Sequence, residues 1–179
     1  MVEFHERPFY ALAIRYGLLL GLCYILFELV RYVTGTHYRT THLHLFFRGI
    51  ALLFSILLML YFYMKKDAIQ LGLKRLVQIG VVLGFTAALI FITYHFILTS
   101  FIEPDYYATY SEVFRPDHAR NHPQLSPEEV DADVKAGLAS AWQVAIVALV
   151  STTLTATVLT LCSYWILKKT AFLSRYRKG

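Results

Sequence analysis

The sequence predicts an all-α integral membrane protein: a four-helix bundle with both termini in the cytoplasm, one long outer loop and a fourth helix that extends beyond the membrane. Of the 179 residues, 57% are hydrophobic and only 16% are charged, whereas about a quarter of a soluble domain is charged. The apolar residues form four stretches, each near the roughly 20 residues that cross a bilayer as a helix. Lipid excludes open sheets, so we expect one transmembrane domain over residues 1–179.

The first span covers about residues 10–33. It contains Gly17 and Gly21, four residues apart, and its far end holds an acid and a base, Glu28 and Arg31. A charged pair inside a span is costly unless other helices surround it. We therefore expect the other three spans to pack around this one.

The remaining spans cover about residues 45–65, 75–102 and 138–167. The third is longer than the hydrocarbon core of about 30 Å requires, so it must tilt or protrude. With both termini in the cytoplasm, eleven lysines and arginines lie on the inner side and six on the outer side. The positive-inside rule favours this orientation.

The outer loop, residues 103–137, contains eight of the twelve acidic residues and four of the five prolines. Because prolines interrupt its first half, we expect a structured loop with short helical turns there. The second half has a helix start, with Ser126 as N-cap, Pro127 at the first helical position and Glu129 completing a capping box. We expect this helix to project outward and to run directly into the fourth span.

Several features together carry a resemblance to a known family: Tyr16-Gly17 with Gly21, the pair Gly80 and Gly84, the stretch at 101–105, the acidic helix before span four and the final lysine pair at 168–169. The chain, over about residues 11–169, resembles four-span bacterial membrane proteins catalogued as domain of unknown function forty-one ninety-nine. The resemblance implies a multi-pass protein of the bacterial inner (cytoplasmic) membrane. It implies no known activity and no catalytic residue.

Two glycine pairs provide candidate helix-packing faces, Gly17 with Gly21 and Gly80 with Gly84. Small residues four apart let two helix backbones approach closely, which favours association in lipid. Packing within one chain is the preferred interpretation. Homodimerisation is the alternative.

One polar residue or pair from each span falls at a similar depth below the outer surface. We predict that these residues form an intramembrane polar cluster of Glu28, Arg31, Arg48, His95 and Gln143. In that arrangement Glu28 faces inward and contacts Arg31, Arg48 or His95. Alternatively, the arginines extend to the interface and Glu28 only neutralises one of them.

The sequence contains no motif that indicates catalysis, a cofactor or nucleic-acid binding. His42 and His44 are weak metal candidates, because alternate residues of an extended segment point the same way, but no compact metal motif accompanies them. We therefore predict no catalytic residue, no cofactor and no bound metal.

Three classes of function remain. The first is a structural or accessory membrane protein that binds a protein partner through the outer loop 103–137, since tyrosines favour interfaces. The alternative is a small oligomeric transporter or ion-coupled carrier that uses the Glu/Arg/His cluster. A membrane enzyme is third, because catalytic motifs are missing.

Overall fold

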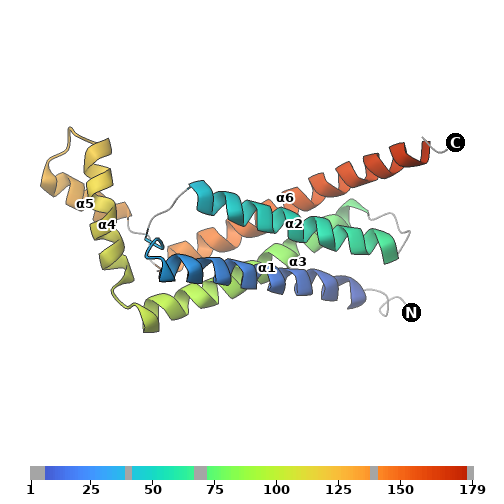
Figure 1. Ribbon diagram of the computed structural model, residues 1–179, viewed down its shortest axis with the longest axis horizontal. Helices are drawn as coiled ribbons and strands as arrows, with labels where there is room; N and C mark the ends of the chain where they lie inside the picture. The colour runs from blue at the N-terminus through green and yellow to red at the C-terminus, as the bar shows by residue number, and fades with distance from the viewer. Residues whose placement is uncertain (1–6, 39–41, 67–71, 138–140, 177–179) are drawn as a thin grey trace.

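The computed structural model describes residues 7–38, 42–66, 72–137 and 141–176, and the regular elements within these residues are all helical. The elements are α1 (Arg7–Val33), α2 (His42–Lys66), α3 (Leu73–Ile97), the π-helical turn η1 (Leu98–Ile102), α4 (Tyr106–Asn121), α5 (Pro127–Gly137) and α6 (Ala141–Tyr176). Figure 1 shows α1, α2, α3 and α6 side by side and the shorter helices α4 and α5 at one end. The predicted all-α fold is confirmed.

Four helices are long and apolar enough to cross a membrane, over Tyr10–Val33, His44–Tyr63, Leu73–Ile102 and Trp142–Lys169. These limits lie within a few residues of the predicted spans, and the chain is an integral, multi-pass membrane protein. At 1.5 Å per residue the 36 residues of α6 measure about 54 Å. The fourth helix is thus longer than the hydrocarbon core of about 30 Å and extends beyond it.

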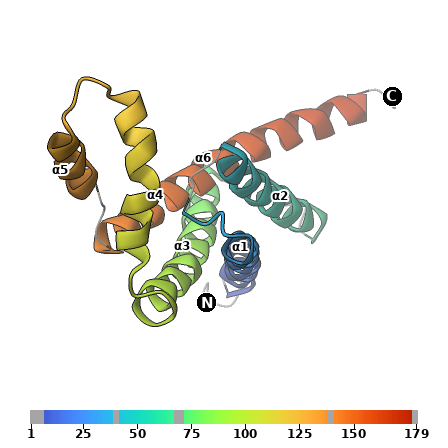
Figure 2. The ribbon, with the colours of Figure 1, turned by 60° about the vertical axis from the view of Figure 1, so that its left-hand side comes forward.

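The central helix of the bundle is α3, and the prediction that the other spans surround the first one is wrong. The most extensive helix contacts join α3 to α6 and α3 to α1, and α2 packs more thinly against α1 and α6 (Figure 2). Of the four spans, α3 also has the largest buried share. The physical reason is that glycines of α1 lie against α3 on one side and glycines of α3 lie against α6 on the other, so that both neighbouring helices can approach α3 closely.

Glycines form both of these close contacts. A Cβ atom added at Gly17 would lie 2.8 Å from Thr86 Cβ, and one at Gly21 would lie 2.7 Å from Ile90 Cβ, so α1 meets α3 there. On its other face, α3 meets the backbone of α6. A Cβ atom at Gly80 would lie 2.5 Å from Thr157 Cα. All four predicted packing glycines lie at contacts within one chain, the last being Gly84 beside Thr153.

The core of the bundle is apolar. Its largest fully buried hydrophobic side chains come from α1, α2 and α3: Leu20, Ile56, Met59, Leu60, Ile79 and Leu83. On α6, Thr160 is fully buried and donates its hydroxyl hydrogen to the carbonyl oxygen of Ala156, at 2.7 Å. The bond satisfies that hydroxyl within its own helix, so a threonine is tolerated in the core.

The helical pair α4 and α5, which we call the hairpin, lies at the end of the bundle opposite both termini (Figure 1). We call this end the hairpin end. The first half of the segment is a 16-residue helix, not the expected loop with short turns. Stacked rings four residues apart favour this helix: Tyr106 with Tyr110 at 6.3 Å and Tyr110 with Phe114 at 6.0 Å. Pro116 removes one backbone donor without ending it.

The predicted start of α5 is confirmed. The Ser126 N–H donates to Glu129 Oε2 at 2.7 Å, and the Glu129 N–H donates to Ser126 Oγ at 3.3 Å. Val130 and Val134 are buried, and α5 packs against α4. The expected direct continuation into the fourth span concerns residues 138–140, which lie outside the described residues.

Candidate functional site

Arg31, near the end of α1, is the central residue of a polar network at the hairpin end. Its side chain is buried, and Nη1 lies 2.8 Å from Glu28 Oε2. Its Nη2 donates to the carbonyl oxygens of Thr36 and His37, both at 3.1 Å. One guanidinium group therefore holds the end of α1 and the connector that follows it.

The backbone turns the connector back over Arg31. Gly35 has a φ of +66°, a conformation that glycine adopts without steric cost. Its N–H donates to the Tyr32 carbonyl at 3.0 Å, and the Thr36 N–H donates to the Arg31 carbonyl at 2.9 Å. This pair of bonds is a Schellman motif. It brings the carbonyl groups of the next residues within reach of the guanidinium.

Glu28 contacts a second helix through His44. The Nε2 atom of His44 lies 2.9 Å from Glu28 Oε1, and its ring stacks on Phe27 with 5.5 Å between centroids. His44 belongs to α2, whereas Glu28 and Phe27 belong to α1. The acid is thus placed between an arginine of its own helix and a histidine of the next.

Arg48 lies on the same side of the bundle but has aromatic partners. Its guanidinium carbon is 4.7 Å from the centroid of Tyr24 and 4.3 Å from the centroid of Phe91. These distances allow cation–π attraction to both rings. The Tyr24 hydroxyl also donates to the Arg48 carbonyl at 3.3 Å. Arg48 therefore links α2 to α1 and to α3.

His95 connects α3 to the hairpin. Its Nε2 lies 3.2 Å from the hydroxyl oxygen of Tyr107, in the first turn of α4. Its ring stacks beside Phe91 at 6.1 Å. Gln143 is exposed near the start of α6. Of the predicted cluster, Glu28 and Arg31 are in direct contact, and His44 joins them. Arg48 and His95 instead approach the ring of Phe91. Gln143 lies at the surface.

A second acid, Glu103, forms a further cluster that the sequence analysis did not identify. Its carboxylate accepts a hydrogen bond from the Tyr38 hydroxyl and lies 3.2 Å from His37 Nε2. The Glu103 N–H donates to the Leu98 carbonyl at 2.7 Å, which closes the π-helical turn. The connector is therefore tied to the end of α3. In the sequence, the signal from which this cluster could have been found was the presence of His37 and Tyr38 in the connector between the first two spans.

Two tyrosines of α4 cover this end of the network. Burial, followed by the nearby carboxylate of Glu28, raises the pKa of Tyr106 to about 12. Burial also raises the pKa of Tyr107. Both phenols therefore stay protonated at neutral pH. A Tyr107 hydroxyl that donates to Nε2 of a neutral His95 leaves the other ring nitrogen, Nδ1, as the hydrogen-bond donor.

The network joins helices and contains no set of metal ligands within the described residues. No group of three histidine, cysteine, aspartate or glutamate side chains could hold an ion there. The extended segment expected at the two candidate metal ligands is helical, because α2 begins at His42. His44 contacts Glu28 instead, and the side chain of His42 lies outside the described residues.

The comparisons with known proteins identify a family and no individual relative. The family model described as "Protein of unknown function (DUF4199)" matches residues 15–169. No curated protein and no solved structure matches the chain. The matched segment runs from the first span to the end of the fourth and includes the whole polar network and the hairpin. The chain therefore belongs to the DUF4199 family.

Proposed function

We propose that this protein is a structural or accessory protein of the bacterial inner membrane, which anchors through its four spans and presents the hairpin to a protein partner. The observation that carries this proposal is the hairpin itself. None of the described residues of α4 is buried, and α4 is tied to the bundle through Tyr107 in its first turn. An ordered helical pair that adds little to the packing of the bundle is suited to contact another molecule.

The charge of the hairpin favours a basic protein surface as its partner. Residues 103–137 contain eight acidic and three basic residues, a formal charge of −5 with histidine neutral. Glu112 and Glu128 are exposed, and Phe114, in the same hairpin, is 43% exposed. Aromatic rings are enriched at protein interfaces. Anionic lipid headgroups would repel this charge, which favours a protein over the bilayer surface as the partner.

The polar network supports the proposal because it fixes the base of the hairpin. Glu103 is held by Tyr38 and His37 from the connector, and Tyr107 lies against His95 of α3. These contacts restrict the direction in which α4 leaves the bundle. A fixed arm loses less conformational freedom on binding than a mobile one.

The carrier alternative has less support from this geometry. Both charges of the Glu28–Arg31 pair have local partners, namely each other, His44 and two backbone carbonyl groups. Buried pairs of this kind are commonly structural. The positions of the basic residues support an orientation in which both termini face the cytoplasm, with the hairpin on the outer side.

Site-specific photo-crosslinking in cells tests the proposal. A photoreactive phenylalanine analogue replaces Phe114 in the hairpin, and the matched control carries it at Leu154, which is 63% exposed on α6 between the two ends of its span. We expect one discrete protein adduct from position 114. Position 154 should yield lipid adducts alone. Mass spectrometry then identifies the captured protein.

A charge test shows whether the adduct depends on the hairpin surface. Glu112→Lys with Glu128→Lys should abolish the adduct from position 114, whereas Glu112→Gln with Glu128→Gln should reduce it only in part. Both double variants should remain helical and membrane-bound. Absence of any discrete adduct from position 114, or equal capture from positions 114 and 154, would contradict the proposal.

A further inference from the structure

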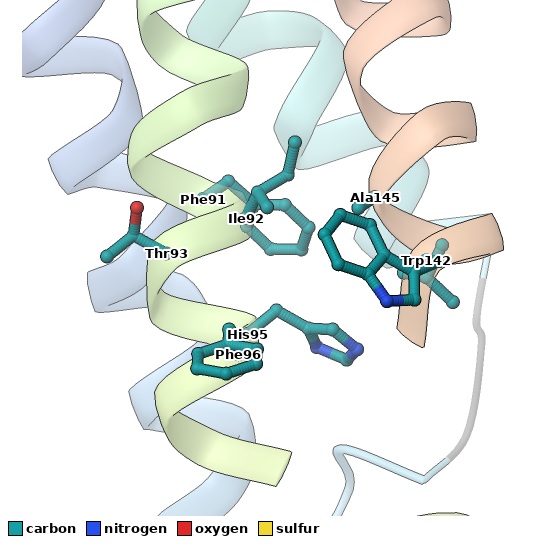
Figure 3. A pocket seen from close by; sticks show the side chains of 8 residues that line it. Phe91, Ile92, Thr93, His95, Phe96, Trp142 and Ala145 are labelled. Carbon is teal, nitrogen blue, oxygen red and sulfur yellow. The ribbon is translucent and has the colours of Figure 1, made fainter. Parts of the chain in front are cut away.

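A cavity of about 270 Å³ lies between α3 and α6 near the hairpin end (Figure 3). Most of its wall is apolar, with Phe91, Ile92 and Phe96 from α3 and Ala145 from α6. With a water molecule taking about 30 Å³ in the liquid, the space is sufficient for one ring system and too small for a whole phospholipid. The cavity therefore has room for a compact apolar group.

The walls favour a flat ring over a saturated chain. Three aromatic side chains line the space, from Phe91, Phe96 and Trp142. Aromatic groups attract one another in offset-stacked and edge-to-face arrangements, beyond the effect of the buried area. Figure 3 shows the ring of Phe91 from α3 and the indole of Trp142 from α6 next to each other. A planar guest can contact both.

Two nitrogen groups supply the polarity of the cavity. The Thr93 hydroxyl is used within its own helix, where it donates to the Leu89 carbonyl at 2.9 Å. His95 and Trp142 remain, and Figure 3 shows the imidazole pointing from α3 toward the nitrogen edge of the indole. The indole N–H is a donor only. When Nε2 of a neutral His95 accepts from the Tyr107 hydroxyl, Nδ1 is a donor as well. In this tautomer both groups suit an acceptor oxygen.

The depth of the cavity suits a molecule that arrives through the bilayer. Trp142 begins the fourth candidate span, and His95 lies seven residues before the end of the third. At 1.5 Å per residue this is about 10 Å below the end of the helix. The exposed fraction is 79% for Trp142 and 55% for Phe96. A ligand can thus enter from the side, between the two helices, and leave an apolar tail in the lipid.

We propose that this cavity binds the ring of a lipophilic quinone, with a quinone carbonyl oxygen accepting hydrogen bonds from the Trp142 indole N–H and from His95. The proposal concerns binding alone. It is independent of the partner that contacts the hairpin, because its evidence lies between α3 and α6.

The chain has two tryptophans, one at the cavity and one far from it, so tryptophan fluorescence can compare binding at the cavity with a distant reference. Trp165 lies 23 residues further along α6, about 35 Å away. Trp165→Phe leaves the cavity tryptophan as the sole indole, and Trp142→Phe leaves the distant one. The full chain in lipid nanodiscs is titrated with a ubiquinone that has one isoprene unit, and tryptophan fluorescence is recorded. We expect saturable quenching in Trp165→Phe and only weak, linear quenching in Trp142→Phe.

Two further variants, made in the Trp165→Phe background, separate binding from folding. His95→Leu should raise the half-saturating quinone concentration on the order of tenfold, as expected for the loss of one hydrogen bond. Ala145→Leu fills the cavity and should abolish saturation while circular dichroism stays unchanged. Equal linear quenching of both tryptophans would overturn the proposal. So would displacement of the quinone by a saturated fatty alcohol at the same concentration, since the cavity would then accept any apolar chain.

Discussion

The middle of the bundle and its hairpin end are held together by different forces. In the middle, α3 meets α1 and α6 through glycines, and a Cβ atom at Gly80 would lie 2.5 Å from a backbone atom of α6. At the hairpin end, Arg31 links Glu28 and two backbone carbonyl groups. Lipid provides no hydrophobic force between helices. Close packing at glycines therefore holds the helices together where they are regular. Hydrogen bonds and ion pairs hold them where the chain turns and exposes backbone groups.

Removal of Arg31 should have the largest effect, because two carbonyl groups lose their donor and the carboxylate of Glu28 loses its arginine and keeps only the contact with His44. We expect Arg31→Met to lower the free energy of unfolding by about 3–5 kcal/mol. The measurement is an SDS titration in mixed micelles, followed by tryptophan fluorescence. A loss of this size would show that the stability of the hairpin end depends on the charge of Arg31.

The double variant Glu28→Met with Arg31→Met sharpens this result. The double variant carries neither charge, so neither residue leaves an unpaired charge inside the protein. It should therefore be more stable than Arg31→Met alone. A double variant that loses at least the sum of the two single losses would show that the pair is not the source of the effect.

Addition of one carbon to the middle of the bundle should have the next largest effect. Gly80→Ala places a Cβ atom against the α6 backbone, which cannot move aside as a side chain can. We expect a loss of about 1–3 kcal/mol, typical of overpacking, in the same SDS titration.

Gly49→Ala is the matched control, since a Cβ atom at this position of α2 meets nothing within 4 Å. Alanine is favoured over glycine in a helix by about 0.5–1 kcal/mol, so this variant should be neutral or slightly stabilised. Equal losses in the two variants would show that the close contact at Gly80 does not limit packing.

The smallest effect concerns the hairpin alone. Ser126→Ala removes the oxygen that caps the Glu129 N–H and should cost about 1 kcal/mol of local helix stability. Hydrogen exchange of peptides from α5 should accelerate, while peptides from α3 stay unchanged. Ser111→Ala in α4 is the control, because that hydroxyl only donates back to its own helix. Faster exchange throughout the bundle would show that the hairpin is not an independent unit.

The same capping box has a defined pH dependence. The hydrogen bonds from the backbone and then the side chain of Ser126 lower the pKa of Glu129 below its ordinary value of 4.5. A lowered pKa in the folded state means that the stabilisation is present above pH 4.5 and is lost as the pH falls through the folded value. Protection of α5 should therefore decrease in acid, and in Glu129→Gln this acid-dependent step should be absent.

The sequence alone predicted features that depend on neighbours along the chain. The four spans follow from runs of apolar residues, and the capping box of Ser126 and Glu129 from a three-residue spacing. Glu28 and Arg31 meet because residues three apart share a helix face. In contrast, His44 and Glu103 find their partners 16 and 65 or 66 residues away. No periodicity within a helix can indicate such pairs.

The first and third spans show what the sequence determines and what depends on the tertiary structure. By itself, the sequence determined that both are membrane helices with small residues four apart, because length and composition decide what lipid accepts. Only the tertiary structure decided that α3 is the central helix and that its glycines face α6, since the pairing of faces depends on how closely several backbones can approach at once. It also placed His95 beside a cavity and Tyr107, whereas the sequence placed it in a cluster with Glu28. Packing geometry, not residue type, sets which polar groups meet.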